Sequence, residues 1–211
     1  SIQLGAAWAV LKTAVTLTRD VIVMGAEQVF ELDTNHFANM LVLAGGASLT
    51  FANVTLMGVR KHNTLQPGLD LVAASGFNAT VVYDGVYIVP PCCLPHDYWP
   101  RYVAELGESE SKVLVSQHYR CTVSGRCYDQ LVTFFDLCMR QASPTVPLSH
   151  HWRLVTMLCP ATVDAICLAG GPMDKCLQRC IEEGKSGRAD ALGGASGGGA
   201  GDGGSGGGGG L

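Results

Sequence analysis

Short apolar segments separated by turn residues fill residues 1–90. Residues 17–25 (LTRDVIVMG) and residues 49–58 (LTFANVTLMG) share one sequence pattern. In each, a polar residue is followed by a few mostly apolar residues and a terminal Met-Gly. When the two copies are aligned on those ends, Asp20 matches Asn53. Asn, Asp and Gly tolerate the left-handed backbone that sharp bends need. The pattern therefore predicts repeated short strands bounded by turns.

Further short apolar runs lie at residues 29–32, 40–43 and 81–89, and a weaker third copy is predicted to begin at residues 77–82. About three strands per repeat would each bury one inward row of side chains, and each repeat would cover the apolar edge of the one before. The protein is therefore predicted to be mainly β, with residues 1–90 forming part of a right-handed parallel β-helix.

The segment LTFANVTLMG resembles the rungs of parallel β-helix proteins of the pectate-lyase type, and the resemblance covers roughly residues 13–90. The chain as a whole resembles exported proteins of green algae that carry a short β-helix, a cysteine-containing segment and a glycine-rich linker. The resemblance implies a fold and export from the cell. It implies little about activity, because unrelated functions share one fold.

The character of the chain changes at residues 90–91, which are both proline and cannot donate a hydrogen bond within a central strand. Residues 91–188 are predicted to be a small disulfide-bonded segment of α+β or helical type. Its expected elements are a strand at residues 112–119 and helices at residues 128–141, 161–168 and 173–183, the last ending at Gly184. Residues 189–211 are mostly glycine and are predicted to form a flexible, disordered linker.

All nine cysteines lie in the second predicted segment. They lack a repeated Cys-x-x-Cys pattern, so disulfides formed in an oxidising compartment are favoured over a zinc site. Neighbouring Cys92 and Cys93 are not expected to pair with each other, because that geometry is strained. The odd count leaves at least one thiol free or paired outside the chain. The disulfide candidates are Cys92, Cys93, Cys121, Cys127, Cys138, Cys159, Cys167, Cys176 and Cys180.

Two further interpretations of the cysteines stay open. Cys121 and Cys127 lie close enough in sequence to close a local loop. A metal or redox site would recruit histidines as well, and its ligands would come from Cys92, Cys93, His96, His150 and His151. Disulfide pairing is the preferred interpretation, so no metal, cofactor or catalytic residue is predicted.

The composition of the 211-residue chain predicts a packed protein, because 47% of its residues are apolar and only 15% are charged. A formal charge of -4 leaves no basic field for a nucleic-acid backbone, so nucleic acid is not an expected partner. Arginine and tryptophan side chains are interpreted without a special role. Arg19, Arg60 and Lys61 are taken as solvated charges, and Trp8, Trp99 and Trp152 as anchors of local cores.

Two asparagines fit the acceptor pattern for N-glycosylation, which marks surfaces of exported proteins. They are Asn53, followed by Val and Thr, and Asn78, followed by Ala and Thr. In a stack of repeats an Asn at such a bend can instead turn inward and bond the neighbouring repeat. Both interpretations stay open for each residue.

These features predict a non-enzymatic extracellular module of structural or interaction type, at the cell surface or in the extracellular space. Glycan or extracellular matrix is the expected partner, and the glycine-rich linker is expected to join it to a further domain of the same chain beyond Leu211. The first alternative is a polysaccharide lyase or hydrolase, which needs a carboxylate cluster that the spacing of the Asp residues does not provide. The second alternative is the ectodomain fragment of a membrane-anchored receptor.

Overall fold

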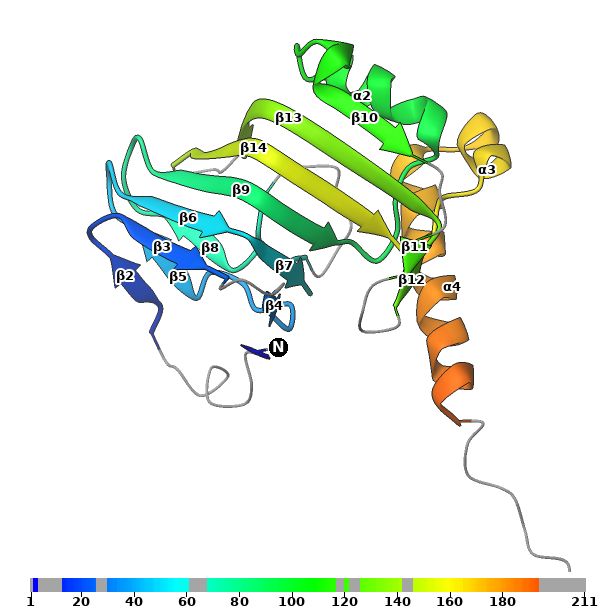
Figure 1. The fold of residues 1–211 in the computed structure, drawn as a ribbon, viewed down its shortest axis with the longest axis horizontal. Coiled ribbons are helices and arrows are strands. Elements are labelled where there is room, and N and C mark those ends of the chain that lie inside the picture. The colour runs from blue at the N-terminus through cyan, green and yellow to red at the C-terminus, as the bar shows by residue number, and fades with distance from the viewer. Residues whose placement is uncertain are drawn as a thin grey trace, which may run out of the picture.

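The computed structural model describes residues 2–3, 13–25, 30–60, 68–116, 120–121, 126–141 and 146–193, without the side chains of residues 2–3, 120–121 and 184–193. Within these residues the protein is mainly β. A nine-stranded sheet carries most of the strands, and separate sheets of three and two strands accompany it. Helices gather at the end of the sheet that the later strands form (Figure 1).

Strands from the first part of the chain stack in parallel. Those of the three-stranded sheet are β2 (Val15–Leu17), β5 (Leu41–Leu43) and β8 (Val72–Ala74). Those that enter the nine-stranded sheet are β1 (Ile2–Gln3), β3 (Val21–Met24), β4 (Phe30–Asp33), β6 (Ser48–Ala52), β7 (Val54–Met57) and β9 (Thr80–Val89). Strand β9 is long enough to pair with β6 along its first half and with β7 along its second half.

The predicted alignment of the two Met-Gly copies is wrong. Strand β3 lies on β6, with Val21 opposite Leu49, and the Gly25 N–H donates to the Ala52 carbonyl at 2.9 Å. Gly58 instead packs against the turn that follows β4. The reason is a corner at Asn53, whose φ of 53° divides the second copy into β6 and β7. The matching Met-Gly ends therefore belong to strands at different places in the fold.

The later strands continue the same sheet with a different pattern. Strand β9 pairs in parallel with β14 (Leu148–Cys159), β14 pairs antiparallel with β13 (Gln130–Gln141), and β13 pairs antiparallel with β10 (Val113–Ser116). The predicted right-handed parallel β-helix of pectate-lyase type is therefore wrong, because the sheet mixes parallel and antiparallel strands. The physical cause is the long β13–β14 pair, whose opposed strand directions a purely parallel stack cannot contain.

The helix predicted at residues 128–141 is wrong as well, because these residues form strands. Strand β13 alternates inward and outward side chains up to Phe134, exposes both Phe135 and Asp136, and then resumes alternation at Leu137. Asp136 has a φ of 50°. The resulting shift places the inward residues Phe134 and Leu137 three apart, which is the spacing expected of a helix.

Short helices and disulfides complete the second half. The helices are η1 (His96–Tyr98), α2 (Trp99–Glu105), η2 (Glu110–Lys112), α3 (Ala165–Gly170) and α4 (Met173–Gly193). The disulfides among the described side chains are Cys92–Cys180, Cys93–Cys159 and Cys167–Cys176. Three such bridges are consistent with an extracellular or secreted protein. None of the helices within the described residues is both long and apolar enough to span a membrane.

Helix α4 continues past Gly184, where the sequence predicts its end, and reaches Gly193. A glycine costs only about 1 kcal/mol inside a helix, so it does not force a helix to stop. The rest of the predicted linker, residues 194–211, lies outside the described residues. One cluster of buried side chains crosses residue 90, from Leu43 to Ile181. The predicted division of the chain into segments at residues 1–90 and 91–188 stays a prediction.

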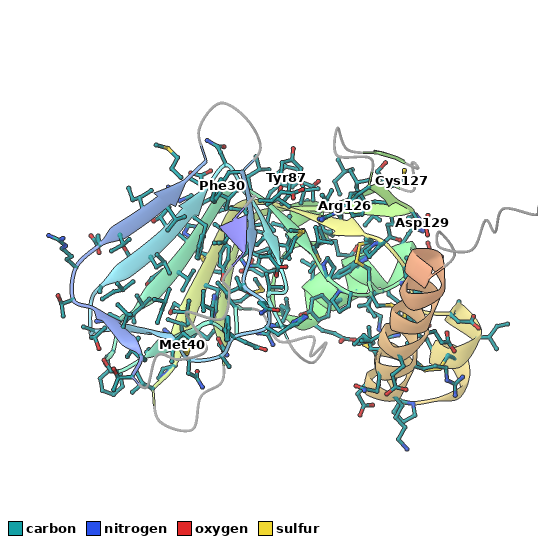
Figure 2. The ribbon with its side chains drawn as sticks, turned by 90° about the horizontal axis from the view of Figure 1, so that it is seen from below. Phe30, Met40, Tyr87, Arg126, Cys127 and Asp129 are labelled. Carbon is teal, nitrogen blue, oxygen red and sulfur yellow. A yellow bond between two sulfur atoms is a disulfide. The ribbon has the colours of Figure 1, made fainter. Side chains whose placement is uncertain are left out.

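Contacts at one edge also join the early and late strands. Arg126 precedes β12 (Cys127–Tyr128), which pairs antiparallel with β11 (Arg120–Cys121). Its guanidinium lies 3.8 Å from the Glu31 carboxylate of β4 and also contacts the sulfur of Met57 in β7. Figure 2 shows Arg126 between Tyr87 on one side and Cys127 and Asp129 on the other. Two regions far apart in sequence therefore meet along this edge.

Candidate functional site

An apolar chamber lies inside the later part of the molecule, with a volume of about 60 Å³. We call it the chamber throughout. The nine-stranded sheet supplies one wall, through Ile88 of β9, Phe134, Leu137 and Met139 of β13, and Trp152 and Met157 of β14. Leu94, Trp99, Tyr102 and Leu177 contribute from the segment after β9 and from helices α2 and α4. Arg60 and Gly68 add a polar edge.

A crease across the sheet sets the position of this wall. It begins at Asn53, continues at Gly85 of β9, where φ is 64°, and ends at Asp136 of β13. A Cβ placed on Gly85 would lie 2.7 Å from Asn53 Oδ1, so only glycine fits there without movement. Between these points the pairing of β9 with β14 is irregular beside Arg153. At the crease, each strand changes which of its alternating side chains point inward. Inward side chains from both sides of the crease therefore face the chamber.

A row of aromatic rings runs along the chamber. Tyr83 meets Trp152 at 6.2 Å between ring centroids, and Trp152 meets Phe134 at 5.2 Å. Phe134 in turn meets Trp99 at 5.4 Å, and Trp99 meets Tyr102 at 5.7 Å. All four contacts are edge-to-face, the arrangement that ring quadrupoles favour. The row ties α2 to the sheet and holds the chamber walls in fixed positions.

The two tryptophans of this row differ in their hydrogen bonding. Trp99 is 4% exposed, and its indole N–H donates to the Leu94 carbonyl at 3.0 Å. Trp152 is 6% exposed, and its indole N–H has no hydrogen-bond partner among the residues that the structure describes. A buried donor without a partner costs about 1 to 3 kcal/mol. The chamber wall at Trp152 therefore contains a buried hydrogen-bond donor that is not satisfied.

Arg60 and Tyr102 supply polar groups at the chamber edge. The Arg60 Nε–H donates to the Gly68 carbonyl at 3.1 Å. Burial lowers the pKa of Arg60, while the neighbouring Asp70 carboxylate acts in the opposite direction. Burial also raises the pKa of Tyr102 to about 12, and the nearby Arg60 charge reduces that effect. At neutral pH the chamber edge therefore carries a partly desolvated guanidinium and a neutral phenol.

His150 extends this polar edge into the buried interior. Its Nε2 lies 3.0 Å from Gln141 Oε1, and its Nδ1 lies 3.2 Å from the Tyr83 hydroxyl. An amide oxygen can only accept, so Nε2 carries the proton and Nδ1 accepts from Tyr83. Burial, with a smaller effect of the Arg60 charge, lowers the pKa of His150 to about 3. The imidazole is therefore neutral and fully used in structural hydrogen bonds.

Few polar side chains line the chamber. Among the described residues that line the chamber, none carries a carboxylate or an imidazole, and Cys92 is held in a disulfide. The polar side chains that do face it are Arg60, Tyr102 and Trp152. Within the described part of the chain, no group of three or more His, Cys, Asp or Glu side chains is arranged to hold a metal ion.

The structure places the predicted glycosylation sites at bends. Asn53 and Asn78 are both exposed and have left-handed φ values of 53° and 62°. They do not occupy equivalent repeat positions, because the Gly46 N–H donates to the Phe77 carbonyl and so places Asn78 beside Gly46. Exposure is compatible with a glycan at either residue. Glycosylation of both stays a prediction.

The cysteines divide into bonded and free. Cys92 and Cys93 bond to different partners rather than to each other, and this leaves neither as a metal ligand. Cys127 is also disulfide-bonded, and its backbone pairs with that of Cys121, whose side chain lies outside the described residues. Cys138 is a free, exposed thiol.

Cys138 lies on the outer face of the sheet, opposite His151 of β14. The His151 Nε2 lies 2.8 Å from Asp136 Oδ1, and this contact lowers the pKa of the Asp136 carboxyl. Of the histidines considered as metal ligands, His150 and His151 thus point to opposite faces of one strand and cannot share an ion. His96 pairs with its neighbour Asp97.

Sequence reasoning missed the chamber and its polar residues. Arg60 is half-buried rather than a freely solvated charge. Trp99 and Trp152 are core anchors as expected from their size, but only the structure reveals that one indole N–H is satisfied and the other is not. No pattern in the sequence signals this difference, because the partner of Trp99 is a backbone carbonyl and the ring neighbours of Trp152 come from the separate strands β9 and β13.

Comparison of the chain with protein-family models, with curated proteins and with solved structures found no match.

Proposed function

We propose that this chain is a non-enzymatic extracellular binding module, which takes a small and largely apolar ligand into the chamber. The disulfides support export, because such bridges persist in oxidising compartments. The chamber supports binding, because ligand sites are concave, mostly apolar and carry a few convergent polar groups.

The observation that carries this proposal is the chamber itself, whose lining is apolar apart from Arg60, Tyr102 and the Trp152 indole. Buried polar groups in proteins are nearly always hydrogen-bonded, so a buried donor without a partner needs an explanation. Here the donor belongs to a side chain that lines a chamber with room for a small molecule. A small apolar ligand would fill this space and contact the hydrocarbon walls.

The expected glycan or matrix partner would have to bind elsewhere on the molecule. A sugar ring carries several hydroxyl groups, and most of them would be left without partners against the apolar walls of Ile88, Leu137 and Met139. Contact with glycan or matrix is therefore proposed for the outer surface alone, together with attachment to a further domain beyond Leu211. The chamber is reserved for a smaller ligand.

The proposal is tested by measuring binding of neutral apolar probes to the oxidised chain. Xenon, ethane and propane, which suit a chamber of about 60 Å³, are titrated under pressure while the melting temperature is followed. We expect saturable binding and a rise in melting temperature, because a ligand that binds only the folded state stabilises it.

A filled chamber provides the control. Leu137→Phe places extra volume at a fully buried residue of the wall, and Leu114→Phe adds the same group at a 61% exposed residue of β10. Binding should disappear in Leu137→Phe and persist in Leu114→Phe. Absence of saturable binding in the parent chain, or equal binding in both variants, would contradict the proposal. So would release of reducing or unsaturated sugar from acidic polysaccharides.

A further inference from the structure

We infer that Asn78 carries an N-linked glycan, and that Asn53, which has the same acceptor pattern, does not. In this modification Asn78 Nδ2 forms a bond to C1 of the first sugar of a lipid-diphosphate donor, the bond between C1 and the diphosphate breaks, and Nδ2 loses one proton. The inference shares the premise of export with the proposed function but does not involve the chamber, so the two are tested independently. It follows from the different surroundings of the two asparagines.

Asn78 lies at the bend between β8 and β9, where the chain faces solvent. Its side chain is exposed and forms no hydrogen bond with any residue that the structure describes. Phe77, the residue before it, is 72% exposed. The backbone holds the bend, because the Phe77 carbonyl accepts a hydrogen bond from the Gly46 N–H at 3.0 Å. A glycan would therefore replace solvent at Asn78 without breaking a contact that shapes the bend.

The neighbouring bend leaves space for a sugar. It contains Gly45 and Gly46, which are both exposed and carry no side chain that could collide with a glycan on Asn78. A Cβ placed on Gly46 would meet no atom of the described residues within 4 Å. The surroundings of Asn78 thus combine an exposed acceptor with open space beside it.

The threonines of the two acceptor patterns differ in burial. The enzymes that attach N-glycans read the asparagine and the threonine two residues later as one unit. Thr80, at the start of β9, is partly exposed, whereas Thr55, within β7, is only 4% exposed. The unit at Asn53 is therefore closed once β7 has packed, while the unit at Asn78 stays partly open in the folded chain.

Asn53 lies inside the stack of strands, between Gly25 after β3 and Gly85 of β9. Its N–H donates to the Asp84 carbonyl at 3.0 Å, and its Oδ1 lies against Gly85, where a Cβ would be 2.7 Å away. On the other side, a Cβ on Gly25 would overlap with the Asn53 carbonyl. A glycan on Asn53 would start against β9, beside the ion pair of Asp84 with Arg153. A chain modified there before folding would have to open the crease, so we expect it not to be secreted in folded form.

The test maps glycans on chain that a eukaryotic cell has oxidised and secreted. Trypsin cuts after Arg60, Lys61 and Arg101, so Asn53 and Asn78 fall in different peptides. An amidase that releases N-glycans in heavy-oxygen water converts each modified asparagine to a labelled aspartate, which mass spectrometry detects. We expect label at Asn78 in most molecules and none at Asn53. Label at Asn53, or an unlabelled Asn78, would overturn the inference.

Variants of the acceptor pattern show that the label comes from a glycan and not from chemical deamidation. Thr80→Ala should lose both the label and the extra mass of the secreted chain, whereas Thr80→Ser keeps the pattern and should keep both. Asn53→Gln should leave the mass of the glycan unchanged. A label at Asn78 that survives in Thr80→Ala would overturn the assignment.

Matched substitutions test why Asn53 is excluded. Asn53 and Asn78 both have left-handed φ values, of 53° and 62°, so a change to Gln loses the same tolerance for that backbone at either position. In chain produced without glycans in a bacterial periplasm, Asn53→Gln should lower the melting temperature by about 2 °C more than Asn78→Gln, because the longer side chain does not fit over Gly85. Equal shifts would overturn the exclusion of Asn53 by the crease.

Discussion

Two interior regions share strand β9 and yet are built differently. The N-terminal core consists of Leu43, Leu49, Phe51, Val54 and Leu56, which are all almost completely buried. These five side chains are aliphatic except for one phenyl ring. The chamber combines apolar walls with space, a guanidinium and an indole N–H that has no hydrogen-bond partner among the described residues. The difference suggests that the N-terminal core serves stability and that the chamber gives up some packing for a ligand.

Covalent links are also unequal between the regions, since no cysteine precedes Cys92. Replacing both partners of Cys92–Cys180, which are 88 residues apart, by Ala should cost about 4 to 5 kcal/mol. The same change at Cys167–Cys176, which are 9 residues apart, should cost about 2 to 3 kcal/mol, because a shorter loop gains less entropy on release. Urea unfolding of the oxidised variants measures both. Equal losses would contradict the dependence on loop length.

Matched leucines test the packing of the two regions. Leu49 of the N-terminal core is 1% exposed and Leu137 of the chamber wall is 0% exposed. Leu49→Ala should cost about 4 kcal/mol, because it leaves a new cavity in a filled core. Leu137→Ala should cost about 2 kcal/mol, because its side chain already borders open space and loses fewer neighbours. Denaturant titration compares the two, and a larger loss at Leu137 would reverse the comparison.

The buried histidine gives the polar edge a pH dependence. The pKa of His150 is about 3 in the folded protein, against an ordinary value of 6.5. Below about pH 6.5 the unfolded chain therefore binds a proton that the folded chain does not, and stability falls as the pH falls. We expect a loss of about 2 kcal/mol between about pH 7 and about pH 5, measured by urea unfolding.

A variant pair identifies the source of this slope. His150→Gln should remove its contribution, while His151→Gln, on the outer face, should retain it. A slope that is the same in His150→Gln and in the parent chain would show that other groups cause the pH dependence.

The two tryptophans give the smallest expected difference. Trp99→Phe loses a hydrogen bond to the Leu94 carbonyl, whereas Trp152→Phe removes a donor that has no partner. The Leu94 carbonyl also receives the Gln130 side-chain amide, so it is not left bare. Trp99→Phe should therefore be less stable than Trp152→Phe by about 1 kcal/mol. Thermal unfolding without ligand measures this, and the reverse order would mean that Trp152 is already satisfied.

Much of the first region could be predicted from local pattern. The apolar runs at residues 29–32, 40–43 and 81–89 correspond to strands β4, β5 and β9, because alternation and turn residues are local signals. The pairing of β3 with β6 could not be predicted. The similar Met-Gly ends favoured a direct alignment of the two copies, whereas the corner at Asn53 divides the second copy into two strands and shifts the pairing. Which face of a strand turns inward depends on the strands packed around it. The sequence allows several pairings of its short apolar segments, so it does not fix the register.

The second region resisted prediction for two physical reasons. In strand β13 the alternation of inward and outward side chains is interrupted at Asp136. The interruption gives the apolar residues the spacing that a helix would have. The chamber is assembled from residues between Val59 and Leu177, so its walls meet only in the folded chain. The number and position of the cysteines did predict disulfides, while their pairing depended on the same distant contacts.

The most direct test of the account is the nuclear magnetic resonance signal of the Trp152 indole N–H, assigned through Trp152→Phe and followed while xenon is added. We predict that the signal begins at a position typical of an indole N–H without an acceptor. It should then shift and saturate as xenon fills the chamber, because the Trp152 ring lines that space. A Trp152 signal that already has the shift of a hydrogen-bonded indole, or that does not respond to xenon, would contradict the account.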